Sequence, residues 1–277
     1  MVIPELVRRG ARVRGLVHQA ENADKARANG AAQVVVADLR DRRSLEAALA
    51  GVERVFYLSP VFQPDEAELG RGFVEAARAA GVRRFVFSSI IHPVLSALEN
   101  HVVKGPIEDA VLNSGLEYTF LHPAILFQNY TAVWPSVVKT GTLAEPYSAE
   151  RPMSRVDYRD VAEAAAIALT EDRLLYGTFE LCAEGNPDRH GVAALMGEVL
   201  GREIKPATLG FDEWAKKAGM PYNESQMAEL RAMYAWYDVH SLLGNALTLR
   251  AVLGREPRAF RAFFEELAAQ PVGEKQK

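Results

Sequence analysis

Several features that would assign a chain to a special class of protein are absent from this sequence. It contains 1 cysteine, Cys182, so no disulfide can form within the chain, and we expect a reducing, cytoplasmic location. Lys and Arg total 32 against 36 for Asp and Glu, a net charge of −4, which gives no basic field to hold nucleic acid. No apolar run approaches the ~18 residues of a membrane span, and the N-terminus has no signal-peptide layout. We therefore expect neither a nucleic-acid partner nor a membrane partner.

What is present is an ordinary globular composition, with 49% apolar and 25% charged residues, and a repeated pattern in the first half. A helical stretch ends at a glycine and a short apolar run follows, at residues 11–17, 33–37, 55–58, 84–87 and 118–121. These runs do not alternate in polarity, which is typical of strands buried on both faces. Helices alternating with such strands predict an α/β fold, a parallel sheet with helices on both faces.

The second half is less regular and mostly helical. A strand is expected at 178–181, a helix capped by Asp160 before it, and further helices at 188–200, 211–218, 224–239 and 257–269. The tail at 273–277 is expected to fray. We therefore predict a first domain at 1–140 and a smaller, mostly helical lobe at 141–277 that is intertwined with it.

Polar or turn-forming residues directly follow each apolar run of the first half, namely at His18, Asp38, Ser59, Ser88 with Ser89, and His122. In an open parallel sheet, ligands bind outside the carboxyl ends of the strands. Because these residues all come at strand ends, the sequence predicts a nucleotide crevice at one edge of the sheet.

Most of the chain resembles the NmrA-like branch of the atypical short-chain dehydrogenases. The matching pieces are VRGLV at 13–17, VADL at 36–39, RFVFSS at 84–89, His101 with Lys104, SGLEYT at 114–119, His122-Pro123 with Gln128-Asn129, VDYRDVA at 156–162 and LGREP at 253–257. The resemblance implies a Rossmann-type domain, a nicotinamide cofactor and a C-terminal lobe that closes over a small-molecule substrate. It also implies an oxidoreductase that moves hydride to a small carbonyl or quinone-like acceptor. The alternative that stays open is a non-catalytic sensor that binds NAD(P)H and a partner protein.

The sequence departs from this family at its beginning. The family starts with a strand and a glycine-rich turn that feeds the first helix, whereas helical residues begin here almost at Met1. That turn lets the backbone approach a pyrophosphate, so we expect impaired cofactor binding. In the strand order 3-2-1-4-5-6 the missing strand would be central, and each unpaired buried group that it leaves costs about 1–3 kcal/mol. We interpret the chain as an N-terminally truncated form of a functional protein. A natural variant that fills the gap with a rearranged edge or a partner strand remains the alternative.

The candidate cofactor residues lie at the ends of the apolar runs. His18 stands where the family often carries Arg for a 2′-phosphate and where an acid would hold a 2′-hydroxyl, so we favour NADP over NAD; a solvated loop histidine is the alternative. Asp38, followed by Leu39, would lie near the adenine, or would form an Asx turn. Ser59 and Pro60 would line a ribose, or Pro60 would only shape the turn.

Ser88 and Ser89 occupy the place of the substrate-facing serine of short-chain dehydrogenases, or cap the segment that follows. Lys104 is the main chemical candidate, because a lysine here would hold the nicotinamide ribose hydroxyls. His101 would share a helix face with it and donate a proton. The tyrosine of the larger family is replaced by Asn100, and Pro106 is expected to kink the helix. Surface residues without function are the alternative for His101 and Lys104.

The remaining candidates would contact a substrate. Pro123, Phe127 and Asn129 follow the strand that would flank the nicotinamide, and they are expected to shape the substrate pocket. An aromatic and methionine-rich stretch forms either the core of the lobe or a pocket wall for a flat substrate; it comprises Met227, Met233, Tyr234, Trp236 and Tyr237. The histidines and the cysteine show no zinc-ligand spacing, so no metal is expected.

Overall fold

The structure is a computed structural model that describes residues 1–270, so the predicted frayed tail at 273–277 lies outside the described residues. Within the described part of the chain, none of the helices combines the length and the apolar character that crossing a membrane requires.

The chain divides into two compact units. Unit 1 comprises Met1–His122 and Arg159–Glu180, and unit 2 comprises Pro123–Tyr158 and the chain from Leu181 onward. The division differs from the predicted boundary at residue 140, because the segment after His122 belongs to unit 2 and a later helix and strand return to unit 1.

Helices and strands alternate along unit 1. In chain order the elements are α1 (Val2–Arg8), β1 (Arg14–Val17), η1 (Ala20–Asn22), α2 (Ala23–Ala28), β2 (Gln33–Val36), α3 (Arg42–Leu49), β3 (Arg54–Leu58), α4 (Glu66–Ala79), β4 (Arg84–Ser88), α5 (Glu99–Val102), α6 (Gly105–Leu112), β5 (Glu117–Pro123), α8 (Tyr158–Thr170) and β9 (Gly177–Leu181). The glycines expected to end helices, at positions 10, 30, 51, 81 and 115, all have positive φ. The α/β prediction is confirmed, and the strand expected at 178–181 is present as β9.

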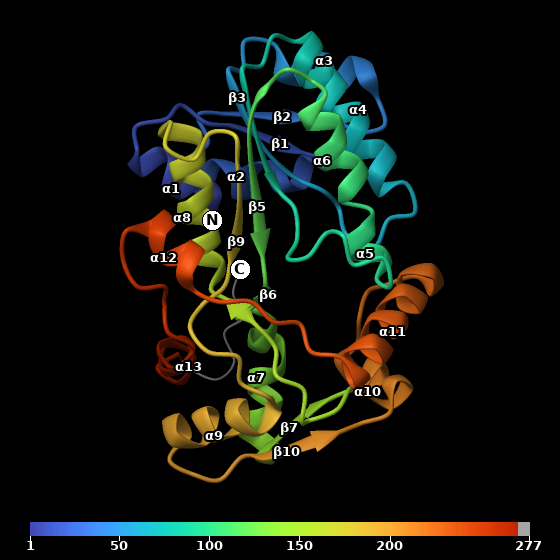
Figure 1. Ribbon diagram of the computed structural model, residues 1–277, viewed down its shortest axis with the longest axis vertical. Coiled ribbons are helices and arrows are strands. Elements are labelled where there is room, and N and C mark those ends of the chain that lie inside the picture. The colour runs from blue at the N-terminus through green and yellow to red at the C-terminus, as the bar shows by residue number, and fades with distance from the viewer. Residues whose placement is uncertain (271–277) are drawn as a thin grey trace. The chain divides into compact units, whose positions relative to one another are not determined.

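A four-stranded sheet in the order β3-β4-β5-β9 forms the centre of unit 1. The strands β3, β4 and β5 are parallel, with Tyr57 paired to Phe87 and Phe87 paired to Phe120. Their side chains build an aromatic core in which Tyr57 stacks on Phe73 of α4 at 4.7 Å between ring centroids. Figure 1 shows α4 and α6 on one side of this sheet and α8 on the other. Unit 1 is therefore a sheet covered on both faces, as the non-alternating apolar runs predicted.

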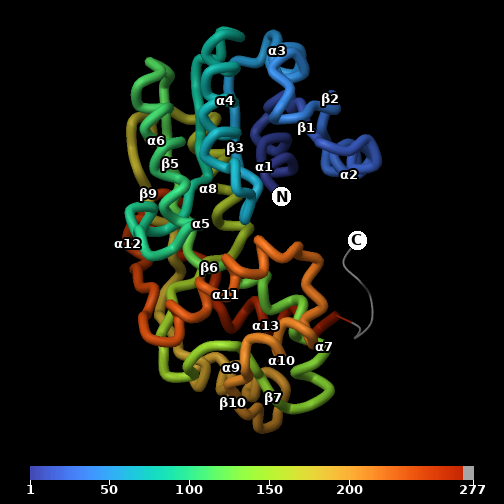
Figure 2. The backbone as a smooth tube through the Cα atoms, turned by 90° about the vertical axis from the view of Figure 1, so that its right-hand side faces the viewer, coloured from blue at the N-terminus to red at the C-terminus, as the bar shows by residue number. Residues whose placement is uncertain are grey.

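The strands β1 and β2 form a separate two-stranded parallel sheet. Small residues let α2 pack closely on it, because a Cβ added at Gly15 would meet the Ala26 side chain at 3.3 Å. Arg14 at the start of β1 donates to the carbonyls of Ala48 at 2.7 Å and Ala50 at 2.8 Å, just before β3. An arginine side chain thus links β1 to the end of α3, the helix that precedes β3. Figure 2 draws α1 beside β1, on the side of β3.

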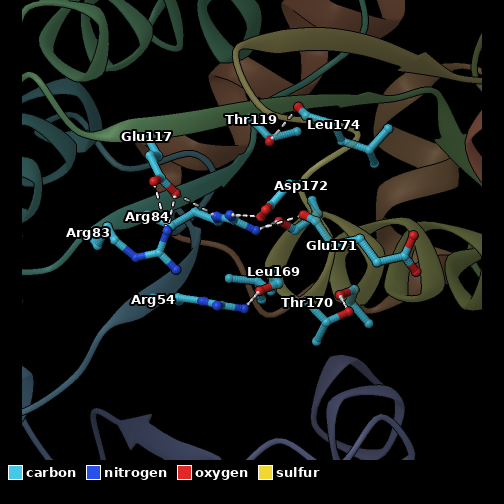
Figure 3. A network of polar contacts seen from close by, with 12 residues as sticks. Arg54, Arg83, Arg84, Glu117, Thr119, Leu169, Thr170, Glu171, Asp172 and Leu174 are labelled. Atoms are coloured by element: carbon cyan, nitrogen blue, oxygen red, sulfur yellow. Dashed lines mark hydrogen bonds and ion pairs between the residues drawn. The ribbon is translucent and has the colours of Figure 1, made fainter.

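At the amino end of the sheet, buried Arg84 ties β4 to the end of α8 (Figure 3). Its guanidinium donates to the carbonyls of Ala168 at 3.1 Å and Glu171 at 2.7 Å, and to the Asp172 carboxylate at 2.5 Å. It also bonds Glu117 of β5 at 3.0 Å. Carbonyls at a helix end lack partners within the helix and favour a cation, so Arg84 fixes α8 against the sheet.

Unit 2 combines short strands with helices. In chain order its elements are β6 (Ile125–Leu126), α7 (Asn129–Thr140), β7 (Thr142–Glu145), β8 (Arg155–Val156), α9 (Arg189–Leu200), β10 (Lys205–Thr208), α10 (Phe211–Ala218), α11 (Glu224–Val239), α12 (Leu247–Leu253) and α13 (Phe260–Ala268). The predicted helices at 188–200, 211–218 and 224–239 are confirmed, and Asp188 caps α9 by accepting from the Gly191 amide. The last helix begins at Phe260 rather than 257. Asp160 lies inside α8, which begins at Tyr158, and is not its cap.

Aromatic residues fill the interior of unit 2. Phe127 is 1% exposed and stacks on Phe260 with ring centroids 4.4 Å apart. Tyr234 of α11 packs against Trp214 at 4.9 Å and against Tyr147 at 5.9 Å. Burial raises the pKa of Tyr234 well above its ordinary value. These contacts favour the lobe-core alternative for the aromatic stretch of α11.

Candidate functional site

A buried polar cluster lies at the carboxyl end of β3. Ser59 follows β3 directly, Glu66 is the first residue of α4, and Lys104 precedes α6. The Lys104 Nζ donates to Ser59 Oγ at 2.8 Å and to the Glu66 carboxylate, while Ser59 donates to Glu66 at 2.6 Å. Each of these residues is at most 3% exposed. The structure therefore brings together Ser59 and Lys104, which the sequence placed at one crevice, around a carboxylate that the sequence analysis missed.

The helix ends explain why the cluster needs its carboxylate. Glu66 stands at the N-terminus of the 14-residue α4, where the helix dipole favours a negative charge by about 0.3–1 kcal/mol. Lys104 stands at the N-cap of α6, where the dipole disfavours a positive charge. Glu66 compensates for this and for the loss of water around the ammonium group. Burial, together with the charge of Glu66, also raises the pKa of the neighbouring Tyr57 hydroxyl.

His101 does not share a helix with Lys104. It belongs to α5, which ends at Val102, whereas Lys104 caps α6. The predicted kink at Pro106 is also wrong, because Pro106 lies in the first turn of α6, where a missing N–H breaks no helical bond. The break between the helices separates the two candidate side chains along the chain.

The buried ring of His101 favours the neutral form. Its Nδ1 lies 3.3 Å from the carbonyl of His92, which can only accept, so Nδ1 carries the proton. Its Nε2 has no hydrogen-bond partner among the described residues. Burial lowers the pKa of His101, and the nearby charge of Lys104 lowers it further. Neutral His101 thus presents a lone pair at Nε2, which suits accepting a proton rather than donating one.

A second polar cluster lies at the carboxyl ends of β4 and β5. Ser89 donates to Glu108 of α6 at 2.6 Å, and the same carboxylate oxygen lies 2.9 Å from His122 Nε2. Ser88 ends β4 and pairs with Leu58 and Leu121 in the sheet. Glu108 was missed by the sequence analysis, although it lies four residues after Lys104, one helical turn away, where it faces the same side of α6.

The residues predicted for the adenine end lie in surface turns. The Asp38 carboxylate accepts from the Arg40 amide at 2.9 Å, which is the Asx-turn alternative. His18 is exposed after β1, and Leu39 and Pro60 are partly exposed. The predicted substrate residues belong to unit 2, where Phe127 has a core role, Asn129 is exposed at the start of α7, and Pro123 ends β5.

A cavity of about 800 Å³ lies within unit 1 between the two sheets. One wall follows β1 from Arg12 to Leu16, and the other follows β3 from Glu53 to Leu58. Of the candidate cofactor residues, only Leu39 lines it. The cavity is therefore distinct from the polar clusters at the carboxyl ends of the strands.

Comparison with known proteins identifies the family. The profile of the NmrA-like family matches residues 1–264. The chain is 30% identical over 259 residues to the NAD(P)H azoreductase of Xenophilus azovorans, covering 92% of this chain and 89% of that one. It is 27% identical over 208 residues to quinone oxidoreductase 2 of Escherichia coli, covering 72% and 71% of the two chains.

Solved structures support the same fold. The NADP(H) complex of the Citrobacter triphenylmethane reductase superposes with a TM-score of 0.84 at 22% identity, over 96% of this chain and 95% of that one. The NADPH complex of the E. coli quinone oxidoreductase gives 0.81 at 24% identity, over 96% and 94%. On the match to its profile and to these relatives, the chain belongs to the NmrA-like family.

Proposed function

We propose that this protein is an NADPH-dependent oxidoreductase that transfers hydride to a small quinone-like or carbonyl acceptor. Family membership supports an NAD(P)H-linked redox enzyme, because relatives are named as an NAD(P)H azoreductase and a quinone oxidoreductase. The observation that carries the proposal is the buried Ser59–Glu66–Lys104 cluster at the carboxyl end of β3. A buried ion pair costs desolvation energy, and its position at the sheet edge where dinucleotides bind favours a binding role.

The donors of this cluster fit a nicotinamide ribose. An ammonium group has three N–H donors. Lys104 uses two of them on Ser59 and Glu66, and within residues 1–270 the third has no partner. It would donate to a ribose hydroxyl, and the Glu66 carboxylate would keep the lysine charged and oriented. At the other end, exposed His18 would meet a 2′-phosphate.

The residues of unit 1 would position the cofactor and the acceptor and would exclude water. The cofactor would supply the chemistry. A bound reduced nicotinamide supplies the hydride. Ser88, Ser89 and Lys104 would form the polar wall of the reaction site. Since His101 is neutral and its Nδ1 proton is held by His92, we assign the proton that the reduced acceptor gains to water. Pro123, Phe127 and Asn129 remain proposed substrate residues, with Phe127 acting through packing.

The test is NADPH oxidation, followed by absorbance, with a panel of quinones, azo dyes and small carbonyls. Lys104→Met should lower kcat/KM about 10–100-fold, the equivalent of a charge-assisted hydrogen bond of about 1.5–3 kcal/mol. Lys25→Met is the matched control, because Lys25 is exposed on α2, and its activity should equal that of the wild type. Failure of the wild-type chain to bind NADPH, measured by fluorescence titration, would refute the proposal.

A non-catalytic NADPH sensor with a protein partner is the second candidate. Its support is Asn100 at the position where the larger family has a tyrosine, since an amide has no titrating proton to give. The same panel separates the candidates. Tight NADPH binding without turnover of any acceptor would favour the sensor, and turnover would exclude a pure sensor.

A further inference from the structure

A chain of hydrogen bonds at the carboxyl ends of β4 and β5 is used only in part by the proposed function. Ser88 and Leu121 form the last residue pair of the two strands, so Ser89 and His122 follow them at the same level. The Ser89 amide, which donates to the Leu121 carbonyl at 2.9 Å, fixes this arrangement. Residues at one level of neighbouring strands point to the same face of a sheet, here the face covered by α6 (Figure 1). The sheet register therefore brings both side chains to Glu108 of α6.

Glu108 connects these buried side chains with solvent. Its Oε1 atom accepts from Ser89 at 2.6 Å and lies 2.9 Å from His122 Nε2. A carboxylate oxygen can only accept, so this histidine nitrogen carries a proton. Ser89 and His122 are each 6% exposed, whereas the Glu108 side chain is 16% exposed. Within residues 1–270 the Oε2 atom of Glu108 has no hydrogen-bond partner. The carboxyl group can therefore exchange a proton with water on one side and with a hydroxyl on the other.

The other titratable groups described at this edge of the sheet lack such access. Glu66 and Lys104 are 1% and 3% exposed and bond each other. His101 is fully buried, its Nδ1 proton faces the His92 carbonyl, and its Nε2 has no partner among the described residues. A proton path needs an unbroken series of exchangeable hydrogens from solvent to the reacting atom. The series that begins at Glu108 meets this requirement, and its inner end is a hydroxyl that both accepts and donates.

We propose that Glu108 and Ser89 form a proton relay, which delivers a proton from water to the oxygen of the reduced acceptor. His122 is a positioning residue, because its Nε2–H group holds the Glu108 carboxylate within reach of Ser89. This role rests on the proposed oxidoreductase function, in which the proton comes from water without an assigned path. The relay also favours one class of acceptor, because carbonyls and quinones gain an O–H bond on reduction and therefore need a proton.

The proton balance of the relay involves three O–H bonds. Glu108 first gains a proton from water, and a half-turn of its carboxyl group directs the new O–H toward Ser89 Oγ. When hydride has reached the acceptor, the negatively charged acceptor oxygen takes the Ser89 proton, and Ser89 takes the Glu108 proton. Glu108 is then again a carboxylate that accepts from Ser89, as the structure shows. Each cycle consumes one NADPH, one acceptor and one solvent proton, and yields NADP⁺ and the acceptor reduced by two electrons.

Glu108→Gln separates the relay from a structural role. The amide keeps an oxygen that accepts from Ser89, but it carries no acid proton to transfer. At saturating NADPH and quinone, kcat should fall about 100-fold, the lower end of a general acid–base contribution, while the Kd for NADPH stays unchanged. Asp109→Asn is the matched control, because Asp109 is the exposed neighbour on α6, and its kcat should equal that of the wild type. An unchanged kcat in Glu108→Gln would overturn the relay, whereas failure of the wild-type chain to bind NADPH would refute the proposed function instead.

An acceptor that gains no proton provides a second control. A cationic triphenylmethane dye takes hydride at its central carbon and becomes neutral, so its reduction needs no relay. With this dye, Glu108→Gln should keep the kcat of the wild type, and an equal loss with the dye and the quinone would overturn the relay. Where the wild-type chain does not reduce the dye, formate tests the same point. Formate should restore part of the lost quinone activity to Glu108→Ala, in which it can occupy the vacated space, and none to Glu108→Gln; equal effects on the two variants would overturn the relay.

His122→Gln and His122→Phe test the positioning role. Glutamine retains an N–H donor near the place of Nε2, so His122→Gln should keep most of the kcat with the quinone. Phenylalanine removes the donor, and kcat should fall about tenfold, comparable with the loss of one hydrogen bond to a charged group. The KM for NADPH should stay the same in both variants, because His122 acts on the carboxylate and not on the cofactor. Equal losses of kcat in the two variants would remove His122 from the relay and leave it a purely structural role.

Discussion

The Glu66–Lys104 pair makes an ordered prediction about three variants. Glu66→Gln leaves the Lys104 ammonium buried without an opposite charge, beside the unfavourable N-terminus of α6. Breaking a buried pair by removing one charge costs about 3–5 kcal/mol. At about 2–4 °C per kcal/mol for a chain of this size, Tm should fall by roughly 6–20 °C.

Lys104→Met should cost less than Glu66→Gln. The Glu66 carboxylate that it leaves behind still accepts from Ser59 at 2.6 Å and still lies at the favourable end of α4. Each of the two helix ends contributes about 0.3–1 kcal/mol to this difference. The double variant has neither charge and should lie within about 1–2 kcal/mol of the wild type, because exchange of a buried pair for neutral side chains is often nearly neutral.

Chemical denaturation of the four proteins gives the coupling energy directly. The matched control is Glu68→Gln, exposed in the same turn of α4, which should change stability by no more than about 0.5 kcal/mol. If the costs of the single variants simply add in the double variant, the two groups do not interact in solution. The role given to Glu66 in holding Lys104 would then be wrong.

Three further predictions concern other parts of the molecule. Arg84→Met should lower the free energy of unfolding by about 1–3 kcal/mol, because it leaves the carbonyls of Ala168 and Glu171 at the end of α8 without their donor. Arg83→Met removes an exposed pair and should cost less than ~1 kcal/mol; urea denaturation compares the two variants. Burial lowers the pKa of His101, so as pH falls the unfolded chain binds a proton at this histidine before the folded chain does. The stability that neutral His101 contributes is present above the unfolded pKa of about 6.5 and is lost as pH falls below it. His101→Phe should reduce the fall in Tm between about pH 7 and pH 5. An equal fall in Tm for the variant and the wild type would refute this prediction. Asp188→Ala removes the cap of α9, whose carboxylate accepts from the Gly191 amide at 2.8 Å, and should cost about 1 kcal/mol by the same denaturation assay.

The fold was predictable from the sequence because its signals are local. A glycine that ends a helix and an apolar run that follows it are short-range features, and they located the strands of unit 1 to within about three residues at each end. The errors came where two local readings compete. Proline inside a helix predicts a kink at Pro106, but the helix that contains it starts one residue earlier. Asp160 is a favourable residue type for a helix cap, yet it lies in the first turn of α8, where an acid is also favoured.

The candidate site was only half predictable, because its partners come from distant positions. Ser59 and Lys104 follow recognisable elements, whereas Glu66 meets Lys104 only once α4 and α6 have packed together. Before that, Glu66 is one acid among several at the start of a helix. Asp38 shows the opposite case, since its carboxylate is used by a turn two residues away. Residue type and strand position identified the edge of the sheet, but not which groups are free to hold a ligand.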